Sequence, residues 1–292
     1  MNAGPTAVFT DLDRTLIYSA RASGRPDVGD LCCVEIYRGE PASFVTPGAA
    51  ADLRALDAAA VWVPTTTRTV AQYRRVDLPR GRRDGPDRAL CANGGVLLVD
   101  GRPDPAWAER VRGVVAAAAP AAEVADGFRR RGDALGGGAV AEVRLAEDLF
   151  HYAVVDRDRT SDGWLEEFRG WADGLGWRTS LQGSKLYCLP AGLTKAAAAR
   201  DLARTLGATR VLAAGDSLLD ADLLVTADAA IRPRHGELEE SGWTAPHVTV
   251  TAGTGIAAGE EIAAWLVAAR GITPAPPRRA ADAGTPGGGP GW

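Results

Sequence analysis

The sequence predicts an α/β protein built on a doubly wound, mostly parallel sheet, with a smaller α+β domain inserted into it. Strand and helix patterns alternate in residues 1–98 and again in residues 188–271, which is typical of a parallel sheet with helices on both faces. Residues 99–187 combine helices with alternating strands, and a chain of 292 residues is too long for a single compact core. We therefore expect a discontinuous core, an inserted cap domain at 99–187, and a disordered Pro- and Gly-rich tail at 272–292.

The first core segment opens with the short β-prone run Ala7 to Thr10, which leads directly into Asp11 and Asp13. These acids should lie at the carboxyl end of a strand, where open parallel sheets bind ligands. The other elements expected in this segment are a hairpin flap from 31–37 and 43–46, a helix at 47–59, strands at 61–63 and 89–91, and a hairpin after the turn Asn93-Gly94-Gly95.

The insert and the second core segment differ in the order of their elements. The insert is expected to contain a helix at 105–119, strands at 139–145 and 150–155, a helix at 163–174, and strands at 177–181 and 185–189. In the second core segment we expect helices at 194–206, 219–225 and 257–269, which alternate with strands at 210–214, 227–231 and 247–250.

Composition excludes several classes of function. The formal net charge of −4, from 33 basic and 37 acidic residues, provides no field that would attract nucleic acid or an anionic membrane. No stretch approaches the roughly 20 apolar residues of a membrane span, and the first residues lack the pattern of a signal peptide. The four cysteines show neither metal-ligand spacing nor a disulfide framework. A cytoplasmic protein without nucleic-acid or membrane partners is the expectation.

Three carboxylates indicate a metal site. Asp11, Asp13 and Asp216 all occupy predicted carboxyl ends of strands that a parallel sheet would bring together. Clustered carboxylates repel one another unless they hold a cation, and Mg²⁺ prefers oxygen ligands of this kind. A helix N-cap is the alternative role for Asp216 taken alone.

Two further residues are candidates for contact with an anion. Thr66 follows the strand at 61–63 and offers a hydroxyl and a backbone amide to a phosphoryl oxygen. Taken alone, Thr66 is more readily explained as a cap for the helix that begins near Thr69. Lys195 lies in the first turn of a predicted helix, where the helix dipole disfavours a cation. Lys195 and Lys185 are the only lysines among the 33 basic residues, which suggests a specific need for an ammonium group.

The motifs Asp11-Leu12-Asp13-Arg14-Thr15 and Gly215-Asp216-Ser217-Leu218-Leu219-Asp220, with Thr66 and Lys195 between them, resemble those of the haloacid dehalogenase-like (HAD) hydrolases. The resemblance spans about residues 6 to 270 and implies a Rossmann-like core. The turn Asn93-Gly94-Gly95, followed by an insert of this size, resembles the subgroup with a type-IIB cap. That subgroup includes Cof-like, sucrose-phosphate and mannosyl-3-phosphoglycerate phosphatases.

The resemblance implies a phosphatase mechanism. Asp11 would attack phosphorus and form an aspartyl-phosphate, and Asp13 would act first as the acid for the leaving group and then as the base for water. Mg²⁺ would be held by the carboxylates of Asp11 and Asp216 and the backbone carbonyl of Asp13, with Asp220 orienting Lys195 or a metal-bound water. Thr66 and Lys195 would neutralise charge on the transferred group. The candidate substrate contacts are Thr66, Thr67, Arg68, Asn93, Lys185 and Lys195. The alternative for Lys185 is a strand lysine whose charged end only reaches solvent.

The substrate implied is a small phosphorylated metabolite, such as a sugar phosphate. A phosphomutase or phosphotransferase of the same fold and a catalytically idle binding module are the alternatives.

Two residues depart from the family pattern: Arg14 stands where many relatives have Gly, and Leu219 stands where many have Asn. Arg14 is expected to restrict the turn or add a cation near the phosphate, and Leu219 to remove a polar group near the metal. Arg68 is expected either to touch substrate or to pair with a carboxylate.

Overall fold

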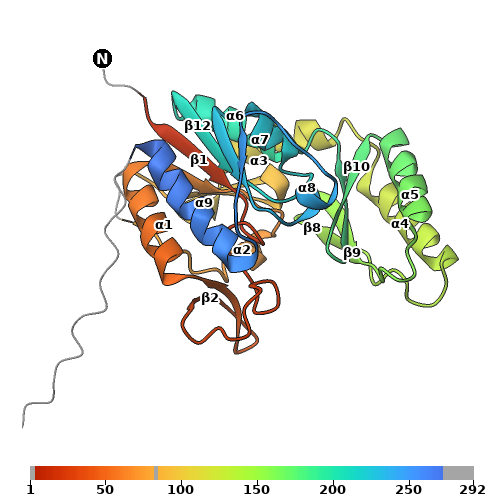
Figure 1. Ribbon diagram of the computed structural model, residues 1–292. Helices are drawn as coiled ribbons and strands as arrows, with labels where there is room; N and C mark the ends of the chain where they lie inside the picture. Colours follow the sequence, from red (N-terminus) through yellow and green to blue (C-terminus); the bar gives the residue numbers. More distant parts are fainter. Residues whose placement is uncertain (1–3, 82–84, 272–292) are drawn as a thin grey trace, which may run out of the picture.

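The computed structural model describes residues 4–81 and 85–271, and the predicted tail lies outside the described residues. Five parallel strands form the core sheet (Figure 1), in the order β14-β13-β12-β1-β4. Their bounds are Thr6–Thr10 for β1, Val61–Pro64 for β4, Arg210–Ala214 for β12, Ala229–Arg232 for β13 and Val248–Val250 for β14. Every residue of β1 is buried, as expected for a central strand covered on both faces.

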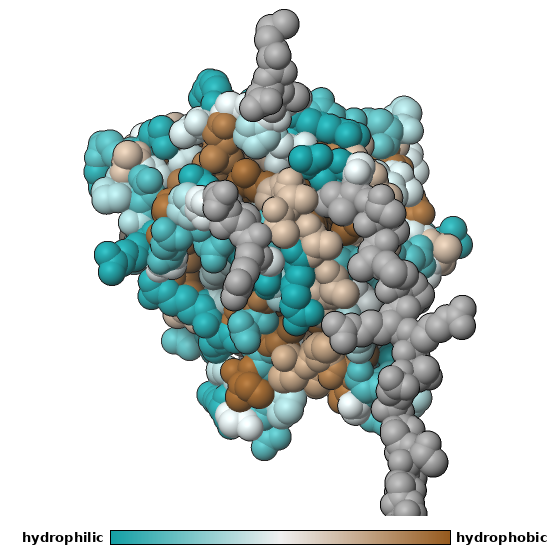
Figure 2. Space-filling model, turned by 90° about the vertical axis from the view of Figure 1, so that its left-hand side faces the viewer, coloured by the Kyte–Doolittle hydropathy of each residue, from teal (hydrophilic) through white to brown (hydrophobic). Residues whose placement is uncertain are grey.

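Helices cover both faces of this sheet. Alternate residues of β1 point to opposite faces, so Val8 packs with α1 and α9, whereas Phe9 packs with α6 and α7. The helices span Pro47–Ala59 (α1), Gly255–Arg270 (α9), Lys195–Thr205 (α6) and Ala221–Thr226 (α7). The predicted doubly wound parallel sheet is therefore confirmed. Figure 2 shows that residues on the left-hand side of Figure 1 are mostly hydrophilic, with smaller apolar areas between them.

Smaller elements surround the carboxyl edge of the sheet. The expected flap is an antiparallel hairpin of β2 (Cys32–Tyr37) and β3 (Glu40–Val45). A second small sheet contains β5 (Arg88–Cys91), β6 (Val96–Val99) and β7 (Arg102–Pro103), with the 3-10 turn η1 (Ala92–Gly94) between its first two strands. Two short helices complete this edge, namely α2 (Val70–Tyr73) and α8 (Glu237–Glu240).

The insert folds as an antiparallel sheet, in the order β10-β11-β9-β8, with two helices on one face (Figure 1). The strands span Arg144–Ala146 (β8), Phe150–Val154 (β9), Trp177–Gln182 (β10) and Lys185–Pro190 (β11). The helices span Ala121–Ala134 (α4) and Asp162–Gly174 (α5). The predicted α+β character of the cap is therefore confirmed.

Two details of the insert differ from the prediction. The expected helix at 105–119 ends earlier, as α3 (Pro105–Val115), and the sequence reasoning missed α4 altogether. Pro120 separates the two helices because it has no amide hydrogen and ends the first helical pattern. The expected strand at 139–145 is reduced to β8 and an isolated bridge between Val140 and Val155.

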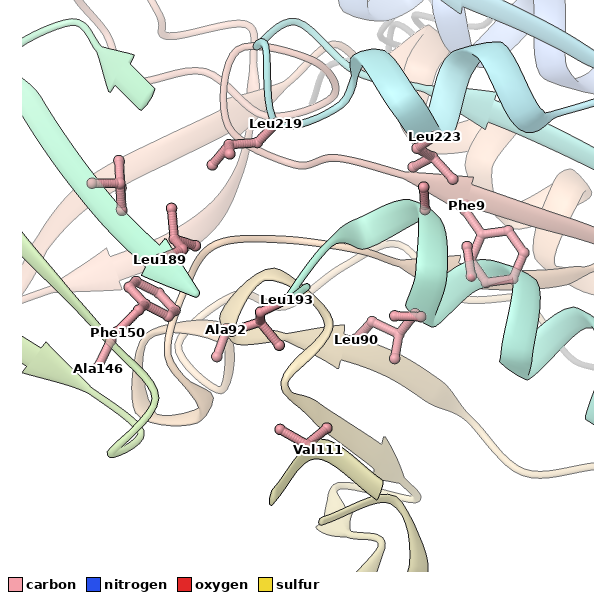
Figure 3. Close-up of a cluster of buried hydrophobic side chains, with 14 of the residues drawn as sticks. Phe9, Leu90, Ala92, Val111, Ala146, Phe150, Leu189, Leu193, Leu219 and Leu223 are labelled. Carbon is pink, nitrogen blue, oxygen red and sulfur yellow. The ribbon is translucent and has the colours of Figure 1, made fainter. Parts of the chain in front are cut away.

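The division into core and cap remains a proposal, and contacts cross its first boundary at residue 99. Strand β7 pairs with β6, and the Trp107 indole of α3 donates a hydrogen bond to the Gly94 carbonyl at 2.9 Å. One hydrophobic cluster also runs from Phe9 of the core to Phe150 of the cap and to Leu189 of β11, the strand that crosses the second boundary at residue 187 (Figure 3). We propose that the first boundary lies after α3, near residue 119.

Among the residues described, no helix has both the length and the apolar character needed to cross a membrane.

Candidate active site

Four charged side chains meet at the carboxyl edge of the core sheet. Asp11 follows β1, Asp216 and Asp220 follow the neighbouring strand β12, and Lys195 is the first residue of α6. The register of the two strands holds the two loops together, because the Asp11 amide donates to the Ala214 carbonyl at 2.8 Å. Segments about two hundred residues apart in sequence therefore share one site.

Lys195 joins two of the carboxylates. Its Nζ lies 2.6 Å from Asp11 Oδ1 and 2.7 Å from Asp220 Oδ1. Lys195 and Asp220 are fully buried, and Asp11 and Asp216 are only 6% and 7% exposed. Thr194 caps α6 by accepting a hydrogen bond from the Ala197 amide, which fixes the first turn and with it the start of the lysine side chain.

The electrostatics of this cluster favour a bound cation. Burial raises the pKa of Asp11 to about 7, against the attraction of Lys195, and the charge of Asp220 adds to the rise. Burial also raises the pKa of Asp216 well above its usual value, and the charges of Asp11 and Asp220 act in the same direction. Burial alone would lower the pKa of Lys195, but the two carboxylates outweigh it and raise that pKa. The cluster thus contains three buried carboxylates and one buried ammonium, so its positive charge does not balance its negative charge.

The donor set fits Mg²⁺. Asp11, Asp216 and Asp220 each offer a carboxylate oxygen, and these oxygens lie within 4.8 Å of one another. Both oxygens of Asp220 already have partners, since Oδ1 accepts from Lys195 and Oδ2 accepts from the Ser217 hydroxyl at 2.7 Å. Asp11 Oδ2 has a weaker competing contact, with the Thr15 hydroxyl at 3.4 Å, whereas Asp220 Oδ2 accepts from the amides of Asp216 and Ser217 as well as from the hydroxyl. Asp11 and Asp216 are therefore the better candidate ligands, and Asp220 contacts Lys195. The Asp13 carboxylate is not part of this group, and the expectation that its backbone carbonyl is a ligand stays a prediction.

A glycine makes room for one of these ligands. Gly236, with φ +91°, lies beside Asp216, and a Cβ at this position would come within 2.6 Å of Asp216 Oδ2. Any side chain here would therefore push the carboxylate away, in addition to the cost of the left-handed backbone.

Thr66 follows the strand next to β1 at the same edge of the sheet, and its amide is already hydrogen-bonded. It follows β4, is fully buried, and its amide donates to the Leu90 carbonyl at 2.8 Å. The expectation of a free Thr66 amide is therefore wrong, because that N–H joins the neighbouring strand β5. The expectation that Thr66 caps a helix is also wrong, because Thr69 is the N-cap of α2 and forms a capping box with Gln72.

Asp13 and Arg68 form an ion pair at the edge of the site. The guanidinium binds both oxygens of Asp13 at 2.7 Å and also binds Glu35 at 2.9 Å. Arg68 was expected either to touch substrate or to pair with a carboxylate, and in the structure it pairs with two carboxylates. Glu35 was not singled out from the sequence, because an isolated acid in a predicted strand carries no signal of its own.

The remaining predicted substrate contacts lie in two places. Asn93 is fully buried in a left-handed turn, and its amide donates to the Leu193 carbonyl at 2.7 Å, two residues before Lys195. Lys185 is exposed at the β10–β11 turn of the cap. Asn93 thus supports the loop that carries Lys195, whereas Lys185 is not part of that loop and lies on the cap.

Tyr187 is a cap residue that the sequence reasoning missed. It lies two residues from Lys185 on β11, hence on the same face of the sheet, and its ring stacks on Tyr152 with centroids 5.8 Å apart. Burial raises the pKa of Tyr187, the Thr67 side chain beside its hydroxyl works against that rise, and the charge of Asp13 adds to it. Tyr187 therefore brings the cap into contact with the reactive edge of the core. The alternating side chains of β11 place Tyr187 on one face of the cap sheet, but the sequence does not indicate which face meets the core.

Two carboxylates connect cap and core on either side of Tyr187. Glu237 of α8 accepts a hydrogen bond from the Ser180 hydroxyl of β10 at 2.9 Å and from the Leu218 amide at 2.9 Å. Glu147 of the cap accepts from the Val70 amide of α2 at 2.8 Å. These contacts join the cap sheet to α8 and the loop after β12 on one side and to α2 on the other.

The two departures from the family pattern have distinct surroundings. Arg14 adopts the left-handed region, with φ +62°, and its carbonyl accepts from the Tyr18 hydroxyl at 2.7 Å and lies 2.8 Å from His235 Nε2. Its Nε lies 3.9 Å from Asp216 Oδ2, so it adds positive charge near a candidate metal ligand. Leu219 is 2% exposed and packs into the hydrophobic cluster (Figure 3).

Comparisons with solved structures show related folds over nearly the whole chain. The sucrose-phosphatase from Synechocystis sp. PCC6803 has a TM-score of 0.59 at 16% identity, covering 90% of this chain and 98% of that one. A haloacid dehalogenase-like hydrolase from Bacteroides thetaiotaomicron has a TM-score of 0.54 at 15% identity, covering 91% and 99%. A HAD subclass IIB sugar phosphatase has a TM-score of 0.52 at 13% identity, covering 92% and 100%.

No protein-family model matches the chain, and no curated protein matches it. The structural likeness confirms the resemblance drawn from the motifs at the level of the fold. The chain has the HAD-like fold with a type-IIB cap.

Proposed function

We propose that this chain is a Mg²⁺-dependent phosphomonoester hydrolase that forms an aspartyl-phosphate and acts on a small sugar phosphate. The observation that supports this most directly is the buried Lys195, whose Nζ lies 2.6 Å from Asp11 and 2.7 Å from Asp220, with Asp216 beside them. A buried carboxylate next to an ammonium and a candidate cation site is suited to attack on an anionic phosphoryl group.

The reaction has two displacements at phosphorus. A carboxylate oxygen of Asp11 attacks the phosphoryl group, the bond from phosphorus to the substrate oxygen breaks, and Asp13 gives that oxygen a proton. Asp13 then removes a proton from water, which attacks the aspartyl-phosphate, releases inorganic phosphate and restores Asp11. The same carboxyl group thus acts as acid in the first step and base in the second.

Lys195 and Thr66 neutralise the charge of the transferred group. An ammonium has three donors, and Lys195 gives two of them to Asp11 and Asp220, which leaves one for a phosphoryl oxygen. The Thr66 hydroxyl is a second donor, since its oxygen accepts from the Arg68 amide at 3.1 Å and its hydrogen remains available. Donors fixed in a buried site stabilise charge without the cost of reorganising water.

Mg²⁺ would be held by the carboxylates of Asp11 and Asp216 and by the Asp13 carbonyl, with Asp220 supporting the loop. When bound, it would offset the negative charge of the carboxylates and of the substrate phosphate. The acidic cluster explains why a cation is needed, because Lys195 alone leaves negative charge in a buried site.

The substrate class rests on the cap. The similar solved structures include a sucrose-phosphatase in complex with sucrose and phosphate and a sugar phosphatase, so sugar phosphates are the first candidates. In this chain Tyr152, Tyr187 and Lys185 share one face of the cap sheet, with Tyr187 nearest Thr67 and Asp13. Aromatic rings and an ammonium suit a polar ring that carries hydroxyl groups.

The test is a hydrolysis screen of the purified chain against a panel of sugar phosphates, with Mg²⁺ and with EDTA. We expect phosphate release that requires Mg²⁺ and is lost in D11N, whose folding is checked by circular dichroism. Turnover by D11N at the wild-type rate would contradict the nucleophile assignment. Phosphate transfer only when an acceptor sugar is added would identify a phosphotransferase instead, and no release from any substrate would favour the idle binding module.

A further inference from the structure

We infer that Glu35, in strand β2 of the flap hairpin, is a positioning residue for Asp13 and acts through Arg68. The inference rests on the proposed function, in which Asp13 is the acid and base. It extends the reaction machinery to a hairpin that supplies no residue to the carboxylate cluster.

Arg68 fixes the plane of the Asp13 carboxylate. Its Nε donates to Asp13 Oδ2 at 2.7 Å and its Nη2 donates to Asp13 Oδ1 at 2.7 Å, which is the two-pronged geometry that holds a carboxylate in one orientation. The Asp13 side chain is 50% exposed, whereas Arg68 is only 12% exposed. Packing therefore does little to hold the acid, and its position depends on the guanidinium.

Glu35 in turn fixes Arg68. Its side chain is 4% exposed, and its Oε2 accepts from Arg68 Nη2 at 2.9 Å and from the Ser43 hydroxyl at 2.7 Å. Its Oε1 accepts from Arg75 Nε at 3.1 Å. Burial works to raise the pKa of Glu35, but the hydrogen bonds from Arg68 and Ser43 outweigh it and lower that pKa, so the residue is ionised at neutral pH.

Glu35 is held firmly by its neighbours, and it orients Arg68, which in turn orients the more exposed Asp13 carboxylate. Glu35 has partners on its own hairpin and on the segment after α2, so its carboxylate is held from several sides. One Arg68 nitrogen, Nη2, donates to both Glu35 and Asp13, and loss of the buried charge would weaken the hold on the guanidinium, whose Nη1 would keep a long hydrogen bond to the Gln72 carbonyl at 3.5 Å. Asp13 would then sample orientations in which it cannot reach the leaving oxygen.

The chemistry supplies a readout that a purely structural role would not change. An alkoxide leaving group, as in a sugar phosphate, needs the proton from Asp13 when its bond to phosphorus breaks. The nitrophenolate of p-nitrophenyl phosphate is a stable anion and leaves without one. Misplacing Asp13 should therefore slow the first displacement on a sugar phosphate much more than on the aryl ester.

The experiment compares kcat/KM, which reports the steps up to the first displacement, for one alkyl and one aryl substrate. Suitable substrates are the best sugar phosphate from the screen and p-nitrophenyl phosphate. E35Q keeps the shape of the side chain and removes its charge. We expect it to lower kcat/KM about tenfold for the sugar phosphate and less than twofold for p-nitrophenyl phosphate. R75A removes another partner of Glu35 but leaves the Arg68 contacts, so the alkyl-to-aryl ratio should stay within twofold of wild type.

Equal loss on both substrates, or no loss on either, would overturn the inference. If E35Q does not fold, R68K carries the same test, because it keeps the charge and removes the two-pronged contact. The proposed function fails separately, since in that case the wild-type chain itself would hydrolyse neither ester.

Discussion

The buried carboxylate cluster predicts that pH and Mg²⁺ act together on stability. Burial raises the pKa of Asp11 from 3.8 to about 7. Between about pH 4 and 7, the unfolded chain has this carboxylate ionised while the metal-free folded chain keeps it protonated. The folded state therefore binds more protons, and stability falls as the pH rises through this window. Above about pH 7 the stability that protonation of Asp11 contributes is fully lost.

The size of the effect follows from the same values. A tenfold change in proton affinity corresponds to about 1.4 kcal/mol, so the rise from 3.8 to about 7 amounts to roughly 4 kcal/mol for the metal-free protein. At about 2 to 3 °C per kcal/mol for a chain of this size, the melting temperature should fall by about 10 °C between pH 4 and 8 through this group. Mg²⁺ at about 100 times its Kd would restore about 3 kcal/mol, and only where the cluster is ionised.

The assay is thermal unfolding from pH 4 to 8, in EDTA and in excess Mg²⁺, for wild type and D11N. We expect Mg²⁺ to raise the melting temperature of wild type strongly at pH 8 and weakly at pH 5. In EDTA, D11N should lose less stability than wild type across the same range, because the titrating group is gone. Equal Mg²⁺ stabilisation at both pH values, or the same EDTA profile for D11N, would refute the reasoning.

Three further predictions concern single residues. Lys195→Met leaves its two buried carboxylates without a counter-charge, and should lower the metal-free unfolding free energy at pH 8 by about 3 to 5 kcal/mol in urea titrations; a loss under 1 kcal/mol would contradict the pairing. Gly236→Ala should displace Asp216 and weaken Mg²⁺ binding at least tenfold by calorimetry, whereas the control Gly242→Ala, at an equally left-handed position with open space around it, should leave binding unchanged. Tyr187→Phe should lower kcat/KM for a sugar phosphate about threefold to tenfold without changing inhibition by inorganic phosphate; an equal effect on both would place the tyrosine at the phosphate instead.

The sequence predicted the core of the site because strand geometry carries that information locally. A β-prone run ending in Asp11 and Asp13, and a second ending before Asp216, must meet at one edge if their strands are parallel. Lys195 stood out because lysine is so rare in this chain. Their meeting in one buried cluster therefore required no knowledge of side-chain packing.

The residues that were missed depend on tertiary contacts. Glu35 pairs with Arg68 across 33 positions, and nothing in the local pattern of a hairpin strand indicates such a partner. Tyr187 lies on a strand whose alternation defines two faces but does not say which one meets the core. Helix α4 was missed because Gly127 and Gly132 lower its helical propensity, although in the fold they admit close packing of Trp171 and Val140.

The central position of β1 has a consequence for how the chain is made. One neighbour of β1, strand β12, is synthesised about two hundred residues later, since Thr6 pairs with Arg210. Until then a strand that is fully buried in the finished fold has an unpaired edge, which is a template for association with other chains. Nascent chains that stop before β12 should therefore be inactive and prone to aggregate, and they should depend on chaperones until the second half of the sheet arrives.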